Sequence, residues 1–436
     1  MSQTSNTVSP CSRLNDDVLR EIFTCIICTE DSCYSKSISR RFVVAGKYRP
    51  FQLGVSQVCS SWRDIALLTP QLWDNIRICD LTEDKLSTAR EYLSRAENLP
   101  VSISIEQCKS GQLWQDWHSQ LTDFLSSYRI RTLEFIAEKM WGFYLVLPDL
   151  PQRSVAELQY LSIKSWHPGQ LKAQLDLNGT RYPKLAVVEI HGAYKISSFN
   201  SLSSLRILYV PGLSMTVIES WNLLSHCSSL ERVWLRMTQV NGSRRPVSMP
   251  QIHLQRLRIL VLGSDSEIPF STFIEVLSLP VLERLTLRNQ AVMSPATAFQ
   301  LLAHRSNYFP HLTSFDLENS TSIVDAGILL ASMPSLKEIS LCPDTTTNKV
   351  VFDDLALNGL ASGSLTPRLR SLKVGRILNM GLFLDMVESR MKNARMSSNR
   401  VAARFTKVVL LDYHGGYRDR CRDMRKRGIP IKSQKD

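Results

Sequence analysis

One apolar pattern recurs along most of this chain and limits the folds that it can adopt. An apolar residue is followed by two variable residues, a second apolar residue, one variable residue and a third apolar residue. Copies begin 20–36 residues apart between residues 130 and 410. Each copy predicts a short strand, and the spacing leaves room for the crossover that a parallel neighbour needs. The eleven copies are Ile130-Leu133-Phe135, Leu158-Leu161-Ile163, Leu185-Val188-Ile190, Leu205-Leu208-Val210, Leu230-Val233-Leu235, Leu257-Leu260-Leu262, Leu282-Leu285-Leu287, Leu312-Phe315-Leu317, Leu336-Ile339-Leu341, Leu369-Leu372-Val374 and Phe405-Val408-Leu410.

Amphipathic stretches separate several of these strands. No single strand–helix unit can bury its apolar face alone, so neighbouring units must stack. The repeat length is similar to that of leucine-rich repeats. We therefore expect an α/β fold, a curved solenoid with a mainly parallel sheet on its concave side and helices on its convex side. An ordinary α/β domain with leucine-rich strands is the alternative. The expected helices cover residues 215–224, 271–279, 295–304, 323–332 and 380–392.

A dense apolar and aromatic cluster lies near the N-terminus. The segment LNDDVLREIF, residues 14–23, predicts a helix with a wide apolar stripe, and Asn15 or Asp16 can cap it. The segment VSQVCSSWRDIAL, residues 55–67, predicts a second helix that ends before Thr69-Pro70, because a residue before proline disfavours the helical conformation. Neither helix can bury its apolar face alone, so we expect them to pack together and leave an apolar surface for a partner.

These two segments, followed by PQLW at residues 70–73, resemble the F-box in the form common in fungal F-box proteins. That family usually opens with Leu-Pro, and Asn15 stands at the proline position here. The resemblance implies an all-α three-helix F-box that binds a Skp-type adaptor and, through it, a cullin. It also implies that the chain is the substrate-recognition subunit of a Skp–cullin–F-box ubiquitin ligase, acting in ubiquitin-dependent protein degradation. The expected adaptor-binding residues are Leu14, Val18, Leu19, Ile22, Val58, Cys59 and Trp62.

The expected organisation has four parts. Residues 1–11 are polar and predict disorder. Residues 12–78 form the F-box, with a loop insertion at 24–54. Residues 79–129 hold linker helices at 81–98 and 114–128 around a first strand at 101–105. Residues 130–436 form the leucine-rich-repeat-like domain that recognises an unidentified protein substrate, and this domain has a basic C-terminal end.

The sequence holds no motif for catalysis or for a cofactor. It has no glycine-rich phosphate loop, no GxSxG and no HExxH. Cys25, Cys28 and Cys33 lie close together, but no second pair and no His accompanies them, so we expect no metal site. No apolar run approaches the length of a membrane span, and the first residues lack a signal peptide's apolar segment. We expect a non-enzymatic protein, cytoplasmic or nuclear, that does not bind membranes.

The net charge of +12 is concentrated at one end. Residues 368–436 hold 18 Lys and Arg against 6 Asp and Glu, which accounts for the whole excess. One alternative function follows: a repeat scaffold without a ligase role, whose basic C-terminal end binds nucleic acid or an acidic partner. The other explanation is a solvated helix at 417–427, and the absence of aromatic residues interleaved with the charges favours it. We therefore expect no nucleic-acid binding.

Overall fold

The computed structural model describes residues 14–28, 42–44, 51–107, 117–137, 143–165, 173–192, 194–198, 202–238, 249–264, 271–288, 296–318, 324–342, 350–375, 377–396, 402–411 and 415–433. Within these residues the chain is an α/β protein with a large, parallel sheet. It divides into two compact units, residues 1–193 and 194–436. None of the described helices has the length and apolar character needed to cross a membrane. The expected disorder at 1–11 concerns residues outside the described ranges.

The first unit begins with helices. The predicted helix at 14–23 is confirmed and runs further, as α1 (Asp16–Cys28). The single helix predicted at 55–67 is wrong, since α2 (Phe51–Val55) and α3 (Ser60–Leu67) are separated by a turn. Cys59 is the reason: its backbone is extended, and its sulfur accepts a hydrogen bond from the Trp62 amide at 3.4 Å, which caps a new helix. A 3-10 turn, η3 (Pro70–Leu72), follows α3.

The parallel sheet of the first unit begins earlier in the chain than the sequence indicated. Two strands, β1 (Phe42–Val44) and β2 (Asn75–Cys79), precede the predicted first strand at 101–105, and both begin inside the stretch 12–78. Ile76 and Ile78 on β2 are fully buried and lie beside Ile103 and Ile105 on β3. The expected loop at 24–54 contains the first of these strands, at residues 42–44. Residues 29–41 and 45–50 lie outside the described ranges. The strand order is β1 (Phe42–Val44), β2 (Asn75–Cys79), β3 (Val101–Gln107), β4 (Ile130–Ala137), β5 (Tyr160–Ser165) and β7 (Val187–His191), each parallel to the next.

Trp73 joins helix α3 to helix α4 (Glu83–Ser94). Its side chain is fully buried, and its indole N–H donates to the Ala66 carbonyl at 2.8 Å. Its ring packs edge-on against Tyr92, with centroids 4.8 Å apart. The linker helices predicted at 81–98 and 114–128 are confirmed with shorter bounds, and Thr82 caps the first of them. The helices are α4 (Glu83–Ser94), α5 (His118–Ser126), α6 (Phe143–Asp149) and α7 (Gln152–Val155), and a short strand β6 (Ala173–Asp176) follows.

The second unit contains eight of the eleven predicted strands, and all eight are confirmed. In register, the central apolar residue of each copy lies beside its counterpart on the next strand. These residues are at most 2% exposed, so each contributes about 1.5–3 kcal/mol of apolar burial. One such row is Leu208, Val233, Leu260, Leu285, Phe315, Ile339, Leu372 and Val408. The strand order is β9 (Ile207–Met215), β10 (Arg232–Met237), β12 (Ile259–Ser264), β14 (Arg284–Arg288), β15 (Ser314–Glu318), β17 (Glu338–Cys342), β19 (Ser371–Val374), β20 (Lys407–Leu410) and β21 (Ile431–Ser433).

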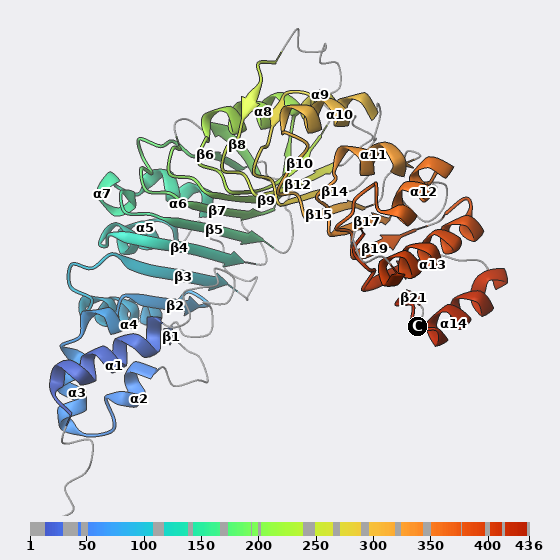
Figure 1. The fold of residues 1–436 in the computed structure, drawn as a ribbon. Helices are drawn as coiled ribbons and strands as arrows, with labels where there is room; N and C mark the ends of the chain where they lie inside the picture. The colour runs from blue at the N-terminus through green and yellow to red at the C-terminus, as the bar shows by residue number, and fades with distance from the viewer. Residues whose placement is uncertain are drawn as a thin grey trace, which may run out of the picture. The chain divides into compact units, whose positions relative to one another are not determined.

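The helices of the second unit lie along one side of its strands (Figure 1). Four of the five helices predicted from 215 to 392 agree with the structure apart from their bounds. The helix predicted at 271–279 ends at Ile274, and its remainder includes a short strand. The polar helix at 417–427 is confirmed, although Cys421 and Met424 are buried on one edge of it. The helices are α8 (Val217–His226), α9 (Ser271–Ile274), α10 (Ala296–Arg305), α11 (Ala326–Ser332), α12 (Asp354–Ser362), α13 (Met380–Met396) and α14 (Arg418–Lys426), with the 3-10 turn η5 (Gly415–Tyr417). The remaining short strands are β8 (Tyr194–Ser198), β11 (Ile252–His253), β13 (Leu277–Ser278), β16 (Val324–Asp325) and β18 (Val350–Val351).

Candidate functional site

Helix α1 has two apolar faces, of which one is buried and the other is exposed. Leu19 and Phe23 are 3% and 1% exposed and belong to the core. Leu14, Val18 and Ile22 are 40%, 46% and 40% exposed. Four-residue spacing places Val18 and Ile22 on one side of the helix, and Leu14 lies just before its first turn. We call Leu14, Val18 and Ile22 the exposed row.

The start of α1 is set by Asn15. Its side-chain oxygen accepts a hydrogen bond from the Asp17 amide at 3.2 Å, and its carbonyl accepts the Leu19 amide at 3.0 Å. Asp16 and Asp17 add negative charge in the first turn, where the helix dipole favours it. Asn15 therefore caps the helix and holds Leu14 at its entrance, next to the first turn.

An aromatic contact holds α1 against α3. The rings of Phe23 and Trp62 are 5.2 Å apart at 62°, an edge-to-face arrangement. Trp62 remains half-buried, whereas Ile65 and Ala66, further along α3, are buried completely. Trp62 thus packs on the core with one side and reaches the surface with the other.

Most of the expected binding residues lie at the surface, but one does not. Val58 is 59% exposed, in the turn before α3, and Cys59 is exposed while its sulfur caps that helix. Leu19 is the exception, because this side chain is buried and faces the core. The physical reason is the packing of α1 on α3. The apolar stripe of α1 is wide, and this packing buries only one edge of it.

Three exposed apolar residues of this segment were missed. Ile26 continues the exposed row by four residues and is 39% exposed, while Leu67 and Leu68 at the end of α3 are 38% and 67% exposed. The helical spacing from Leu14 through Ile22 pointed to Ile26. No comparable pattern in the sequence pointed to the other two.

Among the described residues, no cluster of three or more His, Cys, Asp or Glu side chains is suited to a metal ion. The Cys25 thiol is exposed and donates to the Glu21 carboxylate at 3.5 Å. Cys33, the third cysteine of the sequence cluster, lies outside the described residues.

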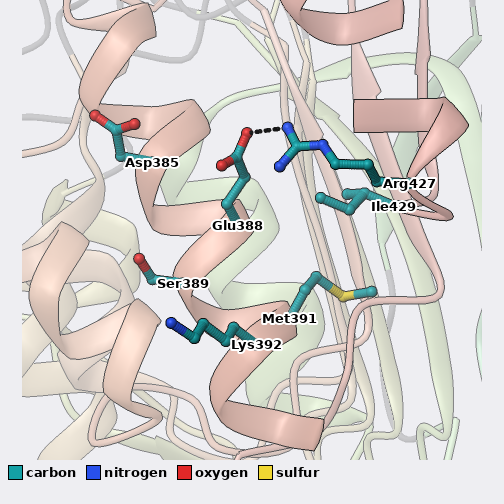
Figure 2. A pocket seen from close by; sticks show the side chains of 7 residues that line it. All are labelled: Asp385, Glu388, Ser389, Met391, Lys392, Arg427 and Ile429. Atoms are coloured by element: carbon teal, nitrogen blue, oxygen red, sulfur yellow. Dashed lines mark hydrogen bonds and ion pairs between the residues drawn. The ribbon is translucent and has the colours of Figure 1, made fainter. Parts of the chain in front are cut away.

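The basic C-terminal end forms part of a pocket of about 490 Å³ between α13 and the segment after α14 (Figure 2). Charges of both signs line it, among them Glu388, Lys392 and Arg427. Arg427 pairs with Glu388 at 2.9 Å, and Arg420 pairs with Asp385. Several of the excess cations therefore pair with carboxylates of this same unit.

The whole chain was compared with known proteins. No model of a known protein family matches it. No curated protein matches it either.

Proposed function

We propose that the chain is the substrate-recognition subunit of a Skp–cullin–F-box ubiquitin ligase. The observation that carries this proposal is the exposed row of α1, set beside a buried row on the same helix. Together with the resemblance of residues 14–23 and 55–73 to an F-box, it supports a Skp-type adaptor as the partner.

The exposed row suits a protein partner for a physical reason. A contiguous apolar face that stays in water is unfavourable, and on a soluble domain it marks an interaction site. An apolar helix face commonly docks in the groove of a partner, with anchors four residues apart. Leu14, Val18 and Ile22 provide such anchors, and half-buried Trp62 supplies an aromatic residue on the neighbouring helix.

In this proposal the rest of the chain is a leucine-rich-repeat-like solenoid that holds the substrate. The parallel strands and their aligned apolar rows support this interpretation. Such a subunit performs no chemistry, since it brings a substrate close to another subunit's catalytic centre.

The alternative is a scaffold that binds nucleic acid or an acidic partner through its basic C-terminal end. The ion pairs of Arg420, Arg422 and Arg427 argue against it, because they leave less charge for a partner. A gel-shift assay at physiological salt separates the two functions, since binding of micromolar strength or tighter would favour the scaffold.

Affinity purification from a fungal extract, followed by identification of the retained proteins, tests the proposal. The full chain is compared with Leu14→Ala/Val18→Ala. The control is Ile218→Ala/Leu301→Ala, which removes apolar groups that are also about half exposed, but on α8 and α10. We expect wild type and control to retain a Skp-type adaptor and a cullin, and the α1 variant to lose both. Equal retention by all three proteins, or none by wild type, contradicts the proposal.

A further inference from the structure

A second surface lies on the sheet of the second unit, on the face opposite the buried apolar rows. Side chains alternate along a strand, so the residues between the buried ones project to this other face. On β9, β10, β12 and β14 the register aligns Tyr209, Trp234, Val261 and Thr286 in one row. The rings of Tyr209 and Trp234 are 5.2 Å apart, and both remain half-buried. Val261 beside them is 8% exposed, so the two rings form most of the accessible surface of this row. We call Tyr209, Trp234 and Val261 the aromatic strip.

Two cations flank this strip on one side. Arg232 and Arg284 lie in the adjacent row, with Ile259 between them in register, and both are exposed. Among the described residues, neither guanidinium has an ion-pair or hydrogen-bond partner. Nearby Arg258, by contrast, pairs with Glu283 at 3.0 Å. The two free cations are two strands apart, about 10 Å between Cα atoms.

The other flank has a glycine on its middle strand. Gly263 lies in register between Arg236 and Arg288. A Cβ added there would meet its nearest atom, the Leu235 carbonyl oxygen, at 3.7 Å, which is ordinary contact. Packing therefore does not require glycine at this position, although the Cγ of Arg236 would lie 3.9 Å from the added Cβ.

We propose that the aromatic strip binds an acidic peptide segment, in which two carboxylates contact Arg232 and Arg284 and an apolar side chain covers Trp234. The inference rests on the proposed function and names the class of substrate segment. Guanidinium groups bind carboxylates through paired hydrogen bonds, and Trp and Arg supply much of the binding energy at interfaces. A separation of about 10 Å matches three residues of a chain in polyproline II conformation, in which every third side chain points the same way, so the acidic residues should lie three positions apart.

The neighbouring strands favour a short peptide over a nucleic acid. On β15 and β17 the same face carries Asp316, Glu318 and Glu338. These carboxylates would repel a phosphate backbone that continued across the sheet. The surface that favours an acidic ligand is therefore limited to strands β9, β10, β12 and β14. A few residues of peptide fit there.

The test uses the full chain and a fluorescent library of ten-residue peptides. Asp is fixed at positions 4 and 7 and the other positions vary, and a second library carries Asn at those two positions. We expect saturable binding of the Asp library by fluorescence anisotropy, and binding at least about tenfold weaker for the Asn library. Arg232→Gln/Arg284→Gln should weaken binding of the Asp library by a similar factor. The control Lys373→Gln/Lys407→Gln removes two exposed cations from β19 and β20 on the same face and should not change it.

Three results would overturn this inference: equal binding of the two libraries, no binding, or unchanged binding by the arginine variant. Tighter binding of a single-stranded oligonucleotide than of the Asp library would also overturn it, in favour of nucleic acid. Thermal melting confirms that each variant is folded. Adaptor retention is measured on the same proteins, so that absence of peptide binding by wild type, with the adaptor retained, refutes this inference alone. Peptide binding without adaptor retention refutes the ligase role alone.

Discussion

The indole ring of Trp62 lies edge-on against the phenyl ring of Phe23, 5.2 Å away, and this contact decides which face of α1 is buried. Phe23 and Leu19 turn toward α3, so Val18 and Ile22 on the other side of α1 reach the surface. Both the fold of this segment and the proposed binding surface therefore depend on how α1 packs against α3. Substitutions on the two faces of α1 should have different consequences.

Leu19→Ala and Val18→Ala form a matched test of the two faces, because these residues are adjacent in sequence. Leu19 is 3% exposed, and its truncation should lower the free energy of unfolding by about 2–4 kcal/mol, since it leaves a cavity. Val18 is 46% exposed, and its truncation should change that free energy by less than about 0.5 kcal/mol. Urea unfolding followed by circular dichroism measures both. Equal decreases in the free energy of unfolding for the two variants would contradict this packing of α1 on α3.

The repeat strands could be predicted because their apolar residues form continuous buried rows. Leu208, Val233 and Leu260 occupy the same place in the pattern and the same row in the sheet. Strand β2 was missed because its sequence, NIRIC, places Ile76 near Leu72 and Trp73, and this cluster resembled a helical turn. Strand β21 has three residues, too few to show any alternation.

The candidate surface was predictable only in part. Spacing along α1 identified Leu14, Val18 and Ile22 as one row, but the apolar stripe also included Leu19. Which edge of a wide stripe is buried depends on the neighbouring helix, and the start of α3 depends on the cap formed by Cys59. Neither the helix pairing nor this sulfur cap has a clear signature in the sequence.

Two glycines with left-handed backbone allow a test of close packing at the C-terminal end of the second unit. Gly363 ends α12 with φ +83°, and an added Cβ would overlap the Cβ of Ala402. Gly428 has φ +80°, but no atom lies within 4 Å of an added Cβ. Gly428→Ala should therefore lower the free energy of unfolding by the conformational penalty alone, about 1–2 kcal/mol. Gly363→Ala should lower it by clearly more, because the added Cβ also overlaps a neighbour. Thermal melting should show the larger decrease for Gly363→Ala, and a larger decrease for Gly428→Ala would contradict this packing.

Arg390 is a structural cation whose removal should be costly. Its guanidinium is fully buried and donates to five backbone carbonyl groups, among them Leu360 at 2.7 Å and Ala403 at 3.1 Å. Burial lowers the pKa of Arg390 to about 10. Arg390→Met should lower the free energy of unfolding by about 3–5 kcal/mol, because buried carbonyls lose their donors. Arg420→Met, which removes a partly exposed ion pair with Asp385, should cost about 1 kcal/mol or less. Similar urea midpoints for the two variants would contradict this role.

His191 should make stability depend on pH. Burial, and secondarily the charge of Lys164, lowers the pKa of His191 below its ordinary value of 6.5. The unfolded chain then binds more protons than the folded one at mildly acidic pH, so stability falls as pH decreases through 6.5. The contribution of His191 to stability is fully lost at pH values below its pKa in the folded chain. His191→Gln should reduce the difference in melting temperature between pH 7.5 and pH 5.5, and an unchanged or larger difference would contradict this assignment.

The most direct measurement is isothermal titration of the purified full chain with a purified Skp-type adaptor. We predict a one-to-one complex for wild type. Leu14→Ala should bind about tenfold more weakly, with the helical signal in circular dichroism unchanged, because Leu14 lies at the entrance of α1. Trp62→Ala should weaken binding more than Leu14→Ala, since it removes both a half-buried anchor and the contact with Phe23. No binding by wild type, or undiminished binding by Leu14→Ala/Val18→Ala, would contradict the proposed F-box function.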